Sequence, residues 1–103
     1  MNDDYESLPP RRANHTVDFV FEGFRFQLTI GYYRDGRIGE VSLAGPRSGT
    51  ALSHIAADSC ELITELLHRY VSVETLTELI RRKEDGNAES IIGEIILQLA
   101  QSP

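Results

Sequence analysis

The chain has 103 residues, of which 41% are hydrophobic and 25% are charged, which suits one folded domain and excludes a disordered, collagen-like or disulfide-rich chain. Its 16 acidic and 10 basic residues give a formal charge of −6, which disfavours non-specific binding to nucleic acid or anionic lipid. A single cysteine, Cys60, excludes an internal disulfide and a zinc ribbon and favours a reducing compartment.

The N-terminal segment, residues 1–13, is polar and contains the pair Pro9-Pro10. This composition predicts a flexible tail ahead of a single domain over residues 14–101. The segment has neither the apolar run of a signal peptide nor the pattern of a transit peptide, and no stretch of the chain is apolar over enough residues to span a bilayer. We therefore expect a cytoplasmic protein without a membrane partner.

Apolar residues then alternate with polar ones, which predicts three strands, over residues 16–21, 24–33 and 38–43. The Glu-Gly pair at residues 22–23 closes a hairpin whose apolar side chains share one face. The Asp-Gly pair at residues 35–36 predicts a second hairpin, with Tyr32 opposite Gly39. The result is an antiparallel meander with one polar face, so its apolar face needs a cover.

Three helices are expected to supply this cover, over residues 51–70, 73–83 and 90–100. Apolar residues at helical spacing predict the first, and Ser72 and Ser90 are suitable N-caps for the other two. The basic run at residues 81–83 suits the last turn of the second helix, where the helix dipole favours cations. The fold class is therefore α+β, a three-stranded meander covered on one face by three helices.

The third helix has a long apolar stripe for so short a segment. Two interpretations stay open: the helix closes the core of one chain, or part of it is the interface of a homodimer. In the second case the interface residues are Ile92, Ile95, Ile96 and Leu99.

The loop before the first helix is the candidate ligand site. Arg47, Ser48, Gly49 and Thr50 precede a helix start, where backbone N–H groups and hydroxyls can hold a phosphate or carboxylate. The same residue types also suit simple helix capping, and the loop lacks the Gly-Lys-Ser/Thr ending of a nucleotide-binding P-loop.

Other candidates for chemistry are weaker. His54 and His68 are too far apart on one helix to share a metal ion. Cys60 has no cationic neighbour one helical turn away, and is better explained as a buried thiol. The acidic residues of the first helix, at positions 58, 61 and 65, are typical of a solvated face. We therefore expect no catalytic residue, no metal and no cofactor.

Residues 23–43 contain the pattern Thr29-x-Gly31 followed by Asp35-Gly36-Arg37-x-Gly39-Glu40. This pattern resembles the TSCPD-type domain at the C-terminal side of adenosylcobalamin-dependent ribonucleotide reductases, which also exists as short stand-alone proteins. Residues 45–50 and 90–93 are similar to the same family, so the resemblance covers about residues 11–99. The Thr-Ser-Cys-Pro-Asp string that names the family is absent, and no catalytic role is implied.

The resemblance implies a non-catalytic accessory module that binds a protein partner, a ribonucleotide reductase or another protein of nucleotide metabolism, and also itself as a homodimer. Arg37 and Glu40 are the candidate partner contacts, because charged residues beside a turn need no particular identity for folding. The alternative is a sensor that binds a small anion, a nucleotide or phosphate, at residues 47–50. No nucleic-acid partner is expected.

Overall fold

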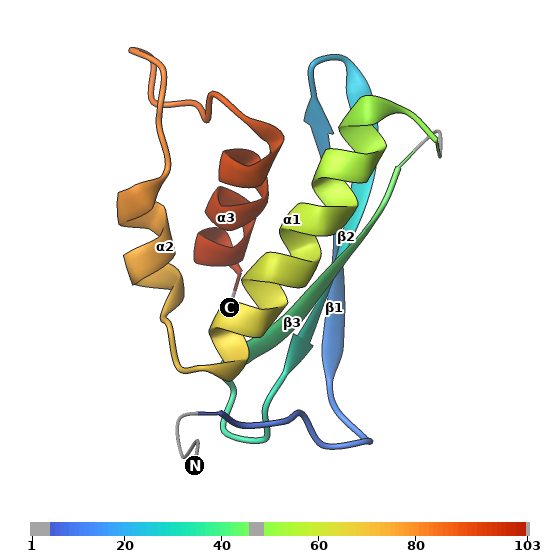
Figure 1. The fold of residues 1–103 in the computed structure, drawn as a ribbon, viewed down its shortest axis with the longest axis vertical. Coiled ribbons are helices and arrows are strands. Elements are labelled where there is room, and N and C mark those ends of the chain that lie inside the picture. Colours follow the sequence, from blue (N-terminus) through green and yellow to red (C-terminus); the bar gives the residue numbers. More distant parts are fainter. Residues whose placement is uncertain (1–4, 46–48, 103) are drawn as a thin grey trace.

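The computed structural model describes residues 5–45 and 49–102, which form one three-stranded sheet and three helices (Figure 1). In chain order the elements are β1 (Asn14–Phe21), β2 (Phe24–Tyr32), β3 (Ile38–Ala44), α1 (Ala51–His68), α2 (Val73–Leu79) and α3 (Ile91–Gln101). The sheet has the order β1-β2-β3 and both pairs are antiparallel. The α+β class and the meander are therefore confirmed. No helix in these described ranges is long and apolar enough to cross a membrane.

The first hairpin has the predicted register. Phe19 lies opposite Phe26, and their rings stack with centroids 5.6 Å apart. Both turn residues have positive φ, 52° at Glu22 and 81° at Gly23. Two such residues form the type I′ turn that follows the natural twist of a two-stranded ribbon.

The second hairpin contains a bulge that the sequence did not predict. Tyr32 lies opposite Ile38, and the register shifts between Gly31 and Tyr32. The predicted pairing of Tyr32 with Gly39 is therefore wrong, because Gly39 is the extra residue of the bulge. The predicted pairs Ile30–Val41 and Leu28–Leu43 are confirmed.

The bulged Gly39 makes room for two side chains. A Cβ atom there would lie 2.5 Å from Cδ2 of Leu8 and 2.8 Å from Cε2 of Tyr33, both inside van der Waals contact. The Tyr33 ring is buried against this glycine, with 4% of its surface exposed. The absence of a side chain at position 39 is thus what lets the N-terminal segment and the Tyr33 ring pack together.

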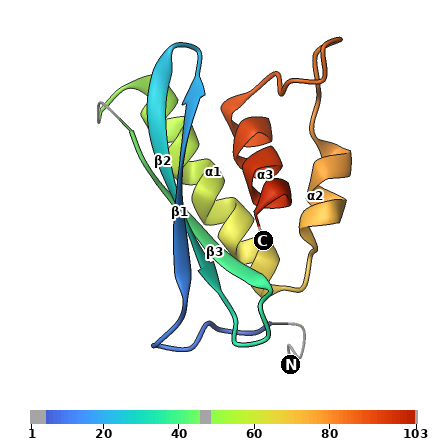
Figure 2. The ribbon, with the colours of Figure 1, turned by 180° about the vertical axis from the view of Figure 1, so that it is seen from behind.

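Helices α1 and α3 lie on the apolar side of the sheet, and α2 lies outside α3 (Figures 1 and 2). The cover predicted from three helices is therefore made by two, since α2 packs mainly against α3. The most deeply buried large side chains come from β2 and α3: Leu28, Ile30, Ile95 and Leu99.

Helix α1 also makes a hydrogen-bonding contact with the β3 edge of the sheet. The Thr64 hydroxyl accepts a hydrogen bond from the Val41 N–H at 3.0 Å and lies 3.2 Å from the Val41 carbonyl. Val41 belongs to the edge strand β3, whose outward backbone groups have no neighbouring strand among the described residues. One threonine thus satisfies polar groups that an open edge would leave to solvent or to another chain.

Helix α1 ends at His68, two residues before the predicted end at residue 70. Tyr70 has a φ of 66°, and the next N–H, of Val71, donates to the Leu66 carbonyl at 3.1 Å. This is the Schellman arrangement, which usually has glycine at the position of Tyr70. A left-handed tyrosine costs about 1 kcal/mol, so the sequence gives little sign of this helix end.

Helix α2 is shorter than the predicted helix over residues 73–83. It ends at Leu79, and Ile80 is extended with φ −84° and ψ 156°. Arg82 pairs with Ala88 in an antiparallel bridge, so the basic run is one arm of a small loop and not the last turn of a helix. The Asp-Gly turn that follows brings residues 81–83 and 87–89 side by side, so that their backbones bond to each other. These bonds replace the hydrogen bonds that a longer helix would make.

The predicted N-caps of the last two helices are confirmed. Ser72 accepts a hydrogen bond from the Thr75 N–H at 3.1 Å, and Ser90 accepts one from the Gly93 N–H at 3.0 Å. Each hydroxyl satisfies a donor that the helix start leaves unpaired.

We expect Gly39→Ala to lower the free energy of unfolding by about 1–3 kcal/mol, because the new methyl group overlaps Leu8 and the buried Tyr33 ring. Urea denaturation measures the change. Ser42→Ala is the matched control, since Ser42 is exposed on the same strand. An equal, small effect of both substitutions would contradict the packing described at Gly39.

Candidate functional site

Arg37 is the centre of a charged cluster at the turn between β2 and β3. Its Nε donates to Asp35 at 2.7 Å and its Nη2 donates to Glu6 at 2.6 Å. The guanidinium carbon also lies 4.5 Å from the ring centroid of Tyr33 and 5.4 Å from that of Tyr70. One side chain therefore joins the N-terminal segment, the β2–β3 turn and the end of α1.

Opposite charges are paired in this cluster, and each affects the pKa of its neighbours. Hydrogen bonds to Glu6 and Asp35 raise the pKa of the Arg37 guanidinium. Hydrogen bonds from the Arg37 backbone and side chain lower the pKa of the Asp35 carboxyl. Burial, and then the charge of Glu6, raise the pKa of the Tyr33 phenol. Two carboxylates face one guanidinium, so the cluster has a negative balance that is unsuited to holding an anion.

The predicted tail, residues 1–13, is described from Tyr5 onward, and this part is in contact with the domain. We call residues 5–12 the N-terminal strap. The Glu6 N–H donates to the His68 carbonyl at 2.7 Å, and the Tyr33 hydroxyl donates to the Glu6 carbonyl at 2.5 Å. At the other end, Arg12 pairs with Glu40 at 2.7 Å.

Arg37 and Glu40, the predicted partner contacts, both pair with the strap. Glu40 lies over Gly31, where a Cβ atom would come within 2.8 Å of its Cγ. The strap gives these charged residues an intramolecular role that the sequence did not suggest. Their proposed contact with another protein stays a prediction.

His68 also contacts the strap. Its Nδ1 lies 3.1 Å from the Tyr5 hydroxyl, and the two rings meet edge to face with centroids 5.4 Å apart. Its Nε2 is buried without a hydrogen-bond partner among the described residues. The histidine is thus packed between aromatic rings, including Tyr33 at 6.3 Å. This is an environment for packing, since the groups placed against the ring are aromatic and no carboxylate or thiol is recorded in contact with it among the described residues.

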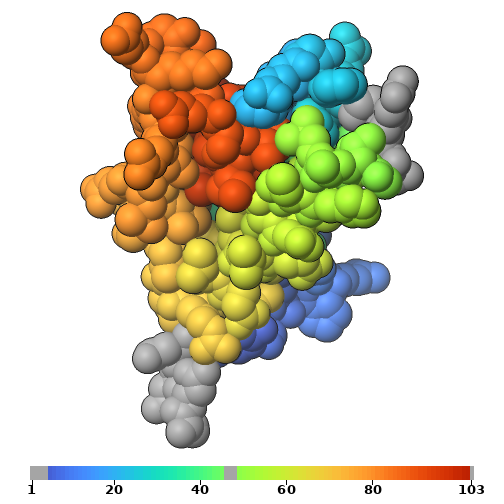
Figure 3. Space-filling view, turned by 45° about the horizontal axis from the view of Figure 1, so that its top comes forward, coloured from blue at the N-terminus to red at the C-terminus, as the bar shows by residue number. Residues whose placement is uncertain are grey.

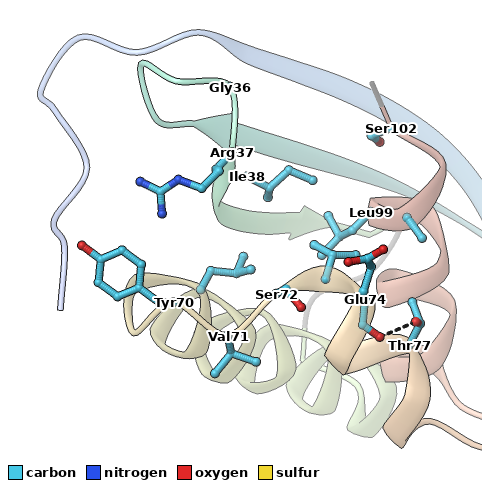
Figure 4. A pocket seen from close by; sticks show the side chains of 13 residues that line it. Gly36, Arg37, Ile38, Tyr70, Val71, Ser72, Glu74, Thr77, Leu99 and Ser102 are labelled. Carbon is cyan, nitrogen blue, oxygen red and sulfur yellow. Dashed lines mark hydrogen bonds between the residues drawn. The ribbon is translucent and has the colours of Figure 1, made fainter. Parts of the chain in front are cut away.

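A shallow cavity of about 440 Å³ lies beside the Arg37 cluster, between the β2–β3 turn, the α1–α2 link and the end of α3 (Figure 4). Its lining includes the apolar side chains of Leu67 and Leu99, and Glu74 stands at the side opposite Arg37. The Ser72 hydroxyl caps α2, and that of Thr77 donates to the Glu74 carbonyl at 2.7 Å. Both hydroxyls are therefore engaged within α2.

The predicted ligand loop is only partly described. Arg47 and Ser48 lie outside the described residues. Gly49 has a φ of 85°, and Thr50 is the N-cap of α1: it accepts from the Ser53 N–H at 3.0 Å, while the Ser53 hydroxyl accepts from the Thr50 N–H at 3.1 Å. In this reciprocal capping box Thr50 caps the helix, which was the alternative interpretation to anion binding.

The predicted dimer residues lie mostly in the core of the single chain. Ile95, Ile96 and Leu99 are buried, and only Ile92, 37% exposed, reaches the surface. Three of these four residues therefore fit the interpretation in which the third helix closes the core of one chain. The homodimer itself stays a prediction.

Three large apolar side chains are exposed on α1 instead. Ile55 is 52% exposed, Leu62 66% and Leu66 39%. With about 100° of rotation per residue they fall within an arc of roughly 40°, so they form one row along the helix. We call these three residues the α1 row. Figure 3 shows α1, coloured green to yellow, running uncovered across the front of the molecule.

Cys60 lies on the opposite, buried side of α1. Burial, and to a smaller extent the charge of Glu61, raise its pKa to about 11, so the thiol is protonated at neutral pH. Groups of three or more His, Cys, Asp or Glu side chains that could hold a metal ion do not occur among the described residues.

Comparison of the chain with models of protein families, with curated proteins and with solved structures gave no match. The resemblance to the TSCPD-type domain therefore stays a prediction.

Sequence reasoning missed the strap and the α1 row. The strap contacts join residues far apart in the chain, Tyr5 with His68 and Arg12 with Glu40, and nothing in a polar, proline-containing segment indicates them. The α1 row did leave a signal. Apolar residues of α1 occupy more of the helical wheel than one core-facing side needs, and Leu62 lies apart from the buried residues of the helix.

We expect Arg37→Ala to release the strap while the domain stays folded. Exposed ion pairs contribute about 1 kcal/mol or less, so the loss of global stability should be small. Hydrogen exchange at the Glu6 amide, which bonds to His68, should become markedly faster. Arg25→Ala, on the exposed face of β2, is the control. Unchanged exchange at Glu6 would contradict the role given to Arg37.

The buried thiol of Cys60 should react slowly with the thiol reagent dithiobis(nitrobenzoate). With a pKa of about 11, about one thiol in a thousand is ionised at pH 8, and its surface is 4% exposed. We expect slow reaction of the native protein, whose rate follows unfolding, and fast reaction in concentrated urea. Reaction of the native protein at the rate of the unfolded chain would show that the thiol is accessible.

Proposed function

We propose that the protein is a non-catalytic binding module that holds a protein partner on the exposed side of α1. The α1 row carries this proposal. Single exposed apolar residues are common on protein surfaces, whereas a contiguous row of large ones marks an interaction site. Ile55, Leu62 and Leu66 are aligned along one side of α1, and exposed polar residues border them.

The helix that carries the row is firmly held, which supports its use as a binding surface. Its buried side, which includes Ile63 and Leu67, belongs to the core. Thr64 bonds to the edge strand, and a capping box begins the helix. Because the backbone of α1 is fixed, little conformational entropy is lost when a partner orders on it.

The resemblance to the TSCPD-type domain supports a first partner to test. In this proposal the module is an accessory of a ribonucleotide reductase or of another cytoplasmic protein of nucleotide metabolism. A second copy of this chain is the other candidate occupant of the α1 row. Arg37 holds the strap at Glu6 and Glu40 holds it at Arg12, and their direct contact with a partner stays a prediction.

Leu62→Glu should abolish partner binding and leave the fold intact, because Leu62 is 66% exposed. The new carboxylate would be buried without a partner in an apolar contact, and this desolvation costs on the order of several kcal/mol. The measurement is affinity capture from native lysate with quantitative mass spectrometry. Leu79→Glu is the matched control, since Leu79 is 73% exposed on α2.

A protein that is captured by the wild type and by Leu79→Glu, and lost with Leu62→Glu, is the expected result. A reductase subunit in that role would connect the resemblance to a function. Light scattering of the three proteins tests self-association in parallel. Identical captured proteins and identical masses for all three would overturn the proposal.

A further inference from the structure

We propose that the partner segment bound by the α1 row is a basic amphipathic helix. This inference rests on the proposed function and adds the chemistry of the partner. Two features of α1 carry it: the spacing of its exposed apolar residues and the sign of the charges beside them.

The spacing favours a helix as the occupant. Ile55, Ser59, Leu62 and Leu66 follow each other at intervals of four, three and four residues. This is the spacing of the a and d positions through which two helices pack side by side. Ser59 is buried and small, so the other three are the contacts available. They span about 16 Å along the axis, which is the length of three turns of a partner helix.

The charges favour a basic partner. In this heptad pattern Asp58 and Glu65 occupy g positions, beside the α1 row, and Glu61 lies on the same exposed side. The e positions on the other side are Ala56 and Ile63, which are buried in the core. In the described part of the chain, the accessible flank of the row is therefore acidic, and residues at such positions form the ion pairs that decide which helix pairs with which.

Glu65 also pairs with Arg69 on its own helix, at 2.7 Å. Both side chains are about half exposed, and an exposed pair of this kind contributes little. A lysine or arginine of a partner can therefore share or replace it. Asp58 and Glu61 have no ion pair among the described residues.

The same charges disfavour a second copy of this chain. In an antiparallel pair of α1 helices the g positions of one copy face those of the other. Asp58 and Glu65 would then meet the same acidic residues, and like charges across a helix pair oppose association. A homodimer through α1 therefore requires charge repulsion at the edge of its apolar contact, whereas a basic helix gains attraction there.

The test uses two labelled peptides of about 20 residues, long enough to form a stable helix when bound. Both have leucine at a and d; one has lysine and the other glutamate at e and g. Fluorescence anisotropy should show the lysine peptide binding the wild type at least about tenfold more tightly than the glutamate peptide. The preference should shrink in about 0.5 M salt, where charges are screened.

A charge-swapped variant gives the decisive comparison. Asp58→Lys combined with Glu65→Lys should reverse the preference in favour of the glutamate peptide, while circular dichroism remains unchanged. Leu62→Glu should remove binding of both peptides, and Leu79→Glu should leave both unaffected.

Equal binding of the two peptides, no binding of either, or a preference that survives the charge swap would overturn the basic-helix inference. Loss of a dimer on Leu62→Glu would identify a second copy as the occupant and overturn it too. The proposed function fails separately. If a captured protein still depends on Leu62 while the peptides show no preference for charge, the binding role stands and the partner chemistry falls.

Discussion

The structure depends on the need to cover a three-stranded sheet that is apolar on one face only. A strand of seven to nine residues, as β2 and β3 are, is about 23–30 Å long, and a helix of 18 residues, as α1 is, is about 27 Å long. The length of α1 is therefore matched to the strands that it covers. Packing on the sheet buries one side of the helix, and the other side faces outward along the same length.

A second constraint acts at the end of the sheet where β2 turns into β3. The bulge removes Gly39 from strand pairing, and the space above this glycine is filled by Tyr33 and Leu8. Tyr33 then bonds to the strap through Glu6, and Glu6 bonds to Arg37. These contacts adjoin one another, so a glycine without a side chain leaves the space in which part of the N-terminal segment packs.

The sequence predicted what local periodicity and turn chemistry determine. The strands, the first hairpin register and the N-caps of α2 and α3 followed from alternation, from positive-φ turn residues and from serine hydroxyls. The bulge at Gly39 and the left-handed Tyr70 did not, because both are set by tertiary packing. For the candidate site, periodicity identifies apolar helix residues but does not say which side the rest of the chain covers. Ile95 therefore fitted an interface as well as a core.

The acidic flank of α1 affects what the exposed apolar row can bind. A row of leucine and isoleucine invites association between copies, and Asp58 and Glu65 place like charges where copies would meet. The net charge of −6 acts in the same direction at longer range. In the proposed complex, the charges that oppose the pairing of two copies attract a basic helix. One set of carboxylates would then both disfavour self-association and select the occupant of the α1 row.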